Sequence, residues 1–204
     1  EKAIGPSSAA CAGLSVAVGA ALKALADFEG VMNEVQAVSG ATADEMRQLR
    51  DAAEDAGATT QFTASEAAEA LGNLARAGLS AGDSVKALKP SMLLAEAGTI
   101  GLAEASEIVT KTLAGFGYAA EESGRVADVL AQGANASNTS VTGLGQALSY
   151  AAPTAVSLGL SLEETVAIIG KFADAGIDAS RAGTALNSIL AQFSNPASKF
   201  RQEL

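Results

Sequence analysis

The sequence predicts an all-α protein, a compact stack of short antiparallel helices joined by glycine-containing turns. Apolar residues recur at steps of three and four, helix-capping residues precede these segments, and alternating β-branched runs bounded by turns are nearly absent. Apolar residues make up 49% of the 204-residue chain, but aromatic residues only 4%. We therefore expect a core of Ala, Leu, Val and Ile, with helices that approach closely through Ala and Gly.

The segment Ser161–Leu186 shows the expected unit. Ser161 and Glu164 have the spacing of a capping box, and Gly176 is placed to end the helix in the left-handed conformation. Asp178 then caps a second helix, for which the spacing predicts Ala182, Leu186, Ile189 and Phe193 as inward residues. Over the whole chain, the residues predicted as structural caps and turns are Thr42, Glu45, Thr63, Glu66, Gly78, Ser80, Gly117, Gly159, Ser161, Glu164, Gly176 and Asp178.

An earlier segment, Thr63–Leu88, aligns with Ser161–Leu186 without a gap. The two lie 98 residues apart, and eight of their 26 paired positions are identical. Either an internal duplication or the common design of Ala-rich helical hairpins accounts for this similarity.

The first part of the chain is an Ala/Gly-rich apolar segment, for which we predict a helix longer than the others, continuing to about Val38. Residues 3–22 carry no charge, which leaves three interpretations: a helix buried against protein, a weak membrane-active segment, or a signal peptide, which Pro6 and Glu1 fit poorly. We divide the chain into this N-terminal helix (1–27), a helical domain (28–193) and the start of a following segment (194–204).

Three positions are predicted as hinges or kinks. Pro90 and Pro153 lack a backbone N–H, so we expect a break or kink at Pro90 and a bend at Pro153. Gly133 opens the longest polar stretch, Gly133–Ser140, which is the candidate hinge.

The net charge is −10, and the 13 basic residues are scattered. Binding to nucleic acid requires clustered Lys and Arg, so specific nucleic-acid binding is not expected. An acidic surface would instead repel DNA that passes close to it.

No catalytic, cofactor or metal site is predicted. Histidine is absent, and the single cysteine, Cys11, is interpreted as a packing residue. The pairs Glu121–Glu122 and Glu163–Glu164 suit the first turns of helices better than acid–base chemistry. Asp174 and Asp178 lack the ligand pattern of a calcium loop, and the Gly-x-Gly segments lack a preceding strand.

Several segments carry a family resemblance. FEGVMNEVQAVSG (28–40) resembles the opening of the conserved domain of tail tape measure proteins of tailed phages, and GATTQFTASEAA (57–68) continues the likeness. The resemblance extends, in the expected order, through LARAG (74–78), ADVLA (127–131), ADAGI (173–177) and AGTAL (182–186).

This resemblance implies a structural role in the virion. Family members lie in the lumen of the tail tube, set its length and leave ahead of the DNA, after assembly in the host cytoplasm. Their implied partners are the tail tube protein, tail-tip or baseplate proteins and assembly chaperones, together with further copies of themselves, a trimer being favoured over a hexamer. Because the long helical regions of the family are missing here, the resemblance suggests a docking or plug module attached to a ruler.

Two alternatives remain at this stage. One is a membrane-active module released into the host envelope during genome ejection, with transient membrane contact through residues 3–22. The other is an enzyme such as the peptidoglycan hydrolases fused to some relatives, for which this sequence has no catalytic residues.

Overall fold

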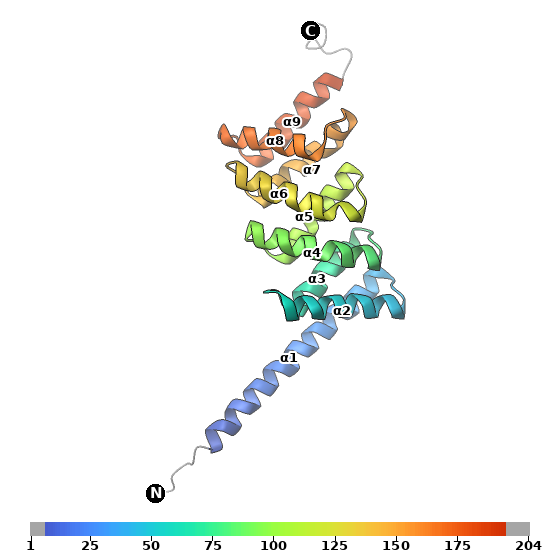
Figure 1. Ribbon diagram of the computed structural model, residues 1–204, viewed down its shortest axis with the longest axis vertical. Coiled ribbons are helices and arrows are strands. Elements are labelled where there is room, and N and C mark those ends of the chain that lie inside the picture. Colours follow the sequence, from blue (N-terminus) through green and yellow to red (C-terminus); the bar gives the residue numbers. More distant parts are fainter. Residues whose placement is uncertain (1–6, 195–204) are drawn as a thin grey trace.

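The computed structural model describes residues 7–194, with side chains from residue 18 to residue 192. Figure 1 shows helices stacked in chain order. Within this part of the chain all regular elements are helical: α1 (Ser7–Ser39), α2 (Ala43–Thr59), α3 (Ala64–Arg76), α4 (Ala81–Gly98), α5 (Leu102–Phe116), the 3₁₀ turn η1 (Ala120–Glu122), α6 (Ser123–Ala136), α7 (Val141–Ser157), α8 (Leu162–Asp174) and α9 (Ala179–Ser194). The predicted all-α class is confirmed.

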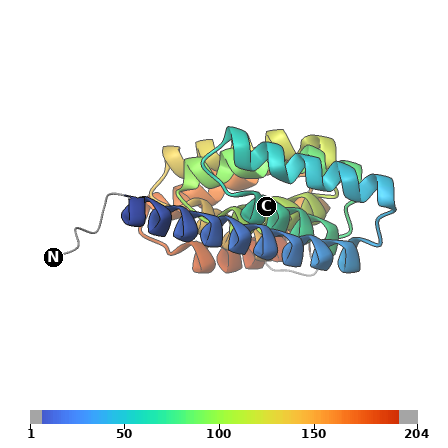
Figure 2. The same cartoon turned by 90° about the horizontal axis from the view of Figure 1, so that it is seen from below.

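The helices form two layers. Each odd-numbered helix packs against the next odd-numbered one, from α1 to α9, and these form the odd layer. Likewise α2, α4, α6 and α8 pack in succession and form the even layer. The end-on view of Figure 2 shows α2 and α1 on opposite sides of the stack. A stack in which each helix pair contacts its neighbours is an α-solenoid.

The structural repeat is a helix pair. From α2 onward, equivalent helices of successive pairs begin 38 to 42 residues apart. The 98-residue alignment instead equates α3 with α8 and α4 with α9, which lie in opposite layers. That similarity therefore follows the helix–turn–helix design and not the register of the solenoid.

Four of the predicted turn glycines end helices in the left-handed conformation. Gly78, Gly117, Gly159 and Gly176 have φ values of 69° to 93°. After each glycine, the next backbone N–H donates to the carbonyl five residues earlier, as from Ile177 to Phe172 at 2.9 Å. These turns reverse the chain and place successive helices in alternate layers.

Other glycines allow helices to pack closely. A Cβ atom on Gly133 of α6 would lie 2.3 Å from Cγ1 of Val166 on α8, and one on Gly183 of α9 would lie 2.5 Å from the Ala147 carbonyl oxygen on α7. The polar linker predicted to open at Gly133 begins later, because α6 continues to Ala136 and Gly133 lies at a packing position within it. The polar connection is shortened to residues 137–140.

The predicted proline positions lie inside helices. α4 is continuous through Pro90, so no new element begins there, and α7 continues through Pro153. On either side of Pro90, Leu88 and Met92 are buried. Because both halves of α4 are anchored in the core, packing compensates for the hydrogen bond that proline does not make.

The long N-terminal helix is as predicted, and it projects from the stack (Figure 1). Among the α1 side chains that the structure describes, from residue 18 onward, Phe28 is the first buried one, whereas Val18 and Leu22 are 57% and 62% exposed. The change coincides with the boundary placed between residues 27 and 28, although α1 itself is continuous across it. Residues 195–204, most of the last predicted segment, lie outside the described residues.

The inward face of α9 differs in part from the prediction. Ala182 and Leu186 are buried, but Leu190 is buried in place of Ile189, which is 43% exposed. The spacing 182, 186, 190 follows one edge of the helix that faces α7 and α8. The side chain of Phe193 lies outside the described residues.

Replacing Gly133 with alanine distinguishes a packing position from a hinge. We expect Gly133→Ala to lower the free energy of unfolding by about 1–3 kcal/mol, because the new methyl group overlaps Val166. Urea denaturation measures the change. Gly124→Ala in the same helix is the matched control, since a Cβ there meets no atom within 4 Å. If Gly133 were a hinge, Gly133→Ala should instead raise the free energy of unfolding, because alanine favours helix over glycine by roughly 1 kcal/mol.

Candidate functional site

Three helices of the stack begin with complete capping boxes. The hydroxyls of Thr42, Thr63 and Ser161 accept the N–H three residues later. In return, the cap N–H donates to the carboxylates of Glu45 at 2.8 Å, Glu66 at 2.8 Å and Glu164 at 2.9 Å. These six residues therefore lie at the positions predicted for them, at the starts of α2, α3 and α8.

The other two predicted caps lie at the starts of α4 and α9. Ser80 accepts the N–H of Asp83 at 3.2 Å, and the Asp178 carboxylate accepts the N–H of Ser180 at 3.0 Å. Thr99, which ends α4 with a φ of +51°, was not predicted as a helix cap. Its neighbour Gly98 is needed for packing, because a Cβ there would lie 2.9 Å from Cγ2 of Val141.

Arg125 of α6 contacts α8, η1 and the connection that precedes η1. Its guanidinium donates to both oxygens of Glu163 on α8, at 2.7 and 2.8 Å, and to Glu122 of η1 at 3.0 Å. It also lies 5.2 Å from the centre of the Tyr118 ring. These hydrogen bonds lower the pKa of Glu163 and raise the pKa of Arg125. The fork geometry of arginine suits this bidentate role.

Arg50 plays a similar part at the other end of the stack. It donates to both carboxylate oxygens of Glu29 on α1, at 2.7 and 2.9 Å, and lies 5.2 Å from the centre of the Phe28 ring. The hydrogen bond from Arg50 lowers the pKa of Glu29. The pair therefore fixes α2 to α1 where α1 enters the core.

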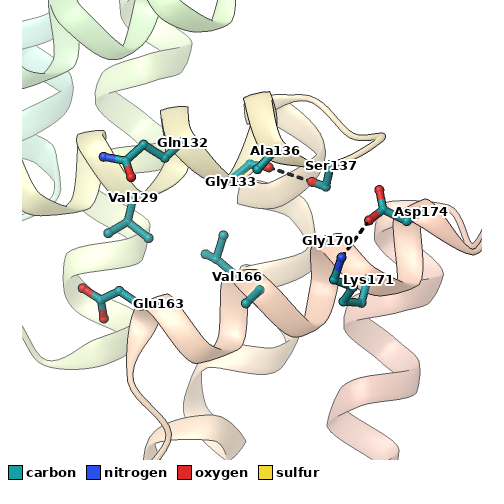
Figure 3. Close-up of a pocket in the computed structure, with 11 residues that line it drawn as sticks. Val129, Gln132, Gly133, Ala136, Ser137, Glu163, Val166, Gly170, Lys171 and Asp174 are labelled. Atoms are coloured by element: carbon teal, nitrogen blue, oxygen red, sulfur yellow. Dashed lines mark hydrogen bonds and ion pairs between the residues drawn. The ribbon is translucent and has the colours of Figure 1, made fainter.

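A groove of about 300 Å³ lies between α6 and α8. Val129 of α6 and Val166 of α8 project into the space between the two helices (Figure 3). Glu163 lines one end, while Lys171 and Asp174, whose charged groups are 3.4 Å apart, line the other. The groove is apolar along its length and charged at both ends. This suits the binding of an apolar side chain or helix rather than catalysis.

The candidate chemical groups have structural partners in the fold. Glu121 pairs with Lys86 at 2.7 Å, so the acidic pairs serve as ion pairs and caps. Asp174 accepts the N–H of Asn138 at 2.9 Å, and Asp178 accepts the N–H of Ser180 at 3.0 Å. Among the described residues, no group of acidic or cysteine side chains could hold a metal ion. The side chain of Cys11 lies outside them.

None of the helices in the described part of the chain combines the length and apolar character needed to cross a membrane.

Comparison with known proteins decides the family. Residues 50–204 match the family described as phage-related minor tail protein. The tape measure protein of Pneumococcus phage Dp-1 is 41% identical over 188 residues, which is 91% of this chain. The chain belongs to the phage tail tape measure family. A probable tape measure protein of Escherichia phage P2 is also similar, with 33% identity over 176 residues, or 85% of the chain. No solved structure matches it.

The tape measure relatives are much longer than this chain. The chain spans 16% of the Dp-1 protein and 22% of the P2 protein. The family resemblance drawn from the sequence is confirmed, and it identifies a structural tail protein, a component of the virion.

The contribution of the ionised capping glutamates to the stability of the fold can be tested by lowering the pH. Hydrogen bonds from the Thr42 and Ser161 backbones, and then from their hydroxyls, lower the pKa of Glu45 and Glu164 below the ordinary value near 4.5. A carboxyl group whose pKa is lowered in the folded state stabilises the fold at pH values above its ordinary pKa. This contribution is lost as the pH falls through the folded-state pKa.

We therefore expect the double variant Glu45→Gln/Glu164→Gln to lose less stability than the unmodified chain between pH 6 and pH 3. Glutamine keeps an oxygen acceptor for the cap N–H but does not titrate. Urea denaturation at steps of pH measures the difference, with Glu69→Gln, outside the caps, as control. An acid dependence as steep as that of the unmodified chain would show that the caps do not contribute.

Proposed function

We propose that this region is a docking or plug module of a tape measure protein inside the tail tube, serving tail assembly, length determination and DNA delivery. The observation that supports it is the folded shape: a stacked solenoid from which the helix α1 projects (Figure 1). A repeated bundle offers surfaces for docking, whereas a ruler needs extended length.

The solenoid is an inefficient ruler. A continuous helix gains about 1.5 Å per residue, so one repeat of 38 to 42 residues would extend roughly 60 Å. Stacking one more helix in a layer adds only about 8–10 Å. Among the elements of residues 7–194, only α1, with 33 residues, has the extended form, with a length of about 50 Å. The stack therefore contributes binding surface in place of length.

In this proposal the module lies in the lumen of the assembled tail and reaches it from the host cytoplasm. Its partners are the tail tube protein, tail-tip or baseplate proteins and assembly chaperones. Several copies surround the tube axis, with a trimer favoured over a hexamer. The net charge of −10 would keep DNA moving past it from adhering.

Deleting the solenoid from a tape measure gene that encodes it tests the proposal. We expect removal of Thr63–Leu190 to give no tails, or tails of unchanged length with a defective tip or failed DNA delivery. Electron microscopy measures tail length, and a DNA-release assay measures delivery.

The matched control removes an equal number of residues from a long helical region of the same protein, which should shorten the tail. Shortening of otherwise normal tails by about 190 Å in the solenoid deletion, as 1.5 Å per residue requires, would show that this region is ordinary ruler.

A second candidate function is contact with the host membrane through residues 3–22. Supporting it are the exposed apolar side chains Val18 and Leu22 on the projecting helix. If this contact occurs, the chain will float with liposomes of host lipid composition, and the chain without residues 3–22 will not. If neither the full chain nor the chain without residues 3–22 is found in the liposome fraction, membrane contact is ruled out as a function.

A further inference from the structure

The even layer contains a second groove equivalent to the first. It lies between α2 and α4 and has a volume of about 280 Å³. Helix α2 contributes four residues to this groove, Ala52 and the residues three, four and seven positions after it. Helix α6 contributes residues with the same spacing to the first groove, starting from Val129. Helix α4 lines the second groove from Val85 to Glu96 with the same spacing as from Glu163 to Asp174 on α8.

The offsets between the two grooves match the solenoid. They are 77 residues on the first helix and 78 on the second, which is two helix-pair repeats. A hydroxyl stands at the same corner of each groove: Thr60 donates to the Ala56 carbonyl at 2.7 Å, and Ser137 donates to the Gly133 carbonyl at 2.6 Å. The fold therefore presents the same groove twice on one face.

Both grooves run lengthwise between helices. The span from Val85 to Glu96, like that from Glu163 to Asp174, covers about 16 Å of helix axis. Leu88 and Met92 line the second groove as Val166 lines the first, and Leu93 stands 53% exposed at its rim. A long apolar groove between helices fits the apolar face of another helix.

The charge of the even layer defines the chemistry of that helix. The even-layer helices together with η1 carry thirteen acidic and six basic residues, a net charge of −7. The odd-layer helices carry seven acidic and four basic residues. Two carboxylates and one lysine line each groove: Asp55, Glu96 and Lys89 in one, Glu163, Asp174 and Lys171 in the other. Each groove therefore has a net charge of −1, and Glu96 and Asp174 lie at the same position. A basic helix complements this face.

We propose that the outer face of the even layer binds basic amphipathic helices of a protein partner, one in each groove. The apolar side of the bound helix fills the groove, and its Lys or Arg residues face Glu96 or Asp174. This inference rests on the geometry and charge of the face and does not depend on the place of the chain in the tail.

The test uses the 204-residue chain and a synthetic amphipathic helical peptide of Leu and Lys, studied by isothermal titration calorimetry. We expect two peptides per chain. Ala52→Trp fills the α2–α4 groove and Ala167→Trp the α6–α8 groove, so each variant should bind one peptide and the double variant none. Ala114→Trp, at an exposed position on odd-layer helix α5, is the matched control and should bind two.

A second pair of variants tests the charge without filling the grooves. Glu96→Lys/Asp174→Lys should raise the Kd for the peptide by about tenfold at low salt. The effect should shrink at high salt, where exposed charges are screened. A peptide with Glu in place of Lys should not bind. Circular dichroism confirms that each variant is folded.

Two results would overturn the proposal. Undiminished binding to the double tryptophan variant would mean that charge alone attracts the peptide to the surface. Self-association of the unmodified chain in analytical ultracentrifugation, abolished by the double tryptophan variant, would make a second copy of the chain the occupant of the grooves.

Discussion

The close approach of helices within each layer is the constraint on which the structure depends. Few residues are aromatic, so the layers are held by many small contacts between Ala, Gly and aliphatic side chains. At Gly133 and Gly183 the neighbouring helix occupies the space that a Cβ would need. A side chain at either position would have to displace its neighbour, so the close approach of these helices favours glycine there.

Polar interactions join neighbouring elements within this framework. Arg50 ties α2 to α1, and Arg125 ties α6 to η1 and α8. Both arginines lie at the surface over an aromatic ring, where they fix orientation more than they add stability. Since each repeat contacts only its neighbours, the stability of the stack is a sum of local terms. The same repetition places equivalent grooves two repeats apart on the even layer.

The candidate site could be predicted in part. Capping boxes and turn glycines depend on residues within one turn of helix, so Thr63, Glu66 and Gly78 were found from spacing alone. The packing contact of Gly133 was not predicted because it depends on Val166, 33 positions later in the chain. The grooves gave no signal either, since each is formed by two helices that are separated in sequence by a third.

The sequence by itself determined the helical class, the starts of most helices, the turns and the family. These depend on local hydrogen bonds, on periodicity and on motifs read in order. Only the tertiary structure decided the two layers, the 38- to 42-residue repeat and the surface that carries the charge. The sequence similarity at 98 residues spans an odd number of helices and therefore crosses between layers. Long-range packing at glycine and alanine decides which helices become neighbours. A pattern that repeats along one helix does not identify the helix that packs against it.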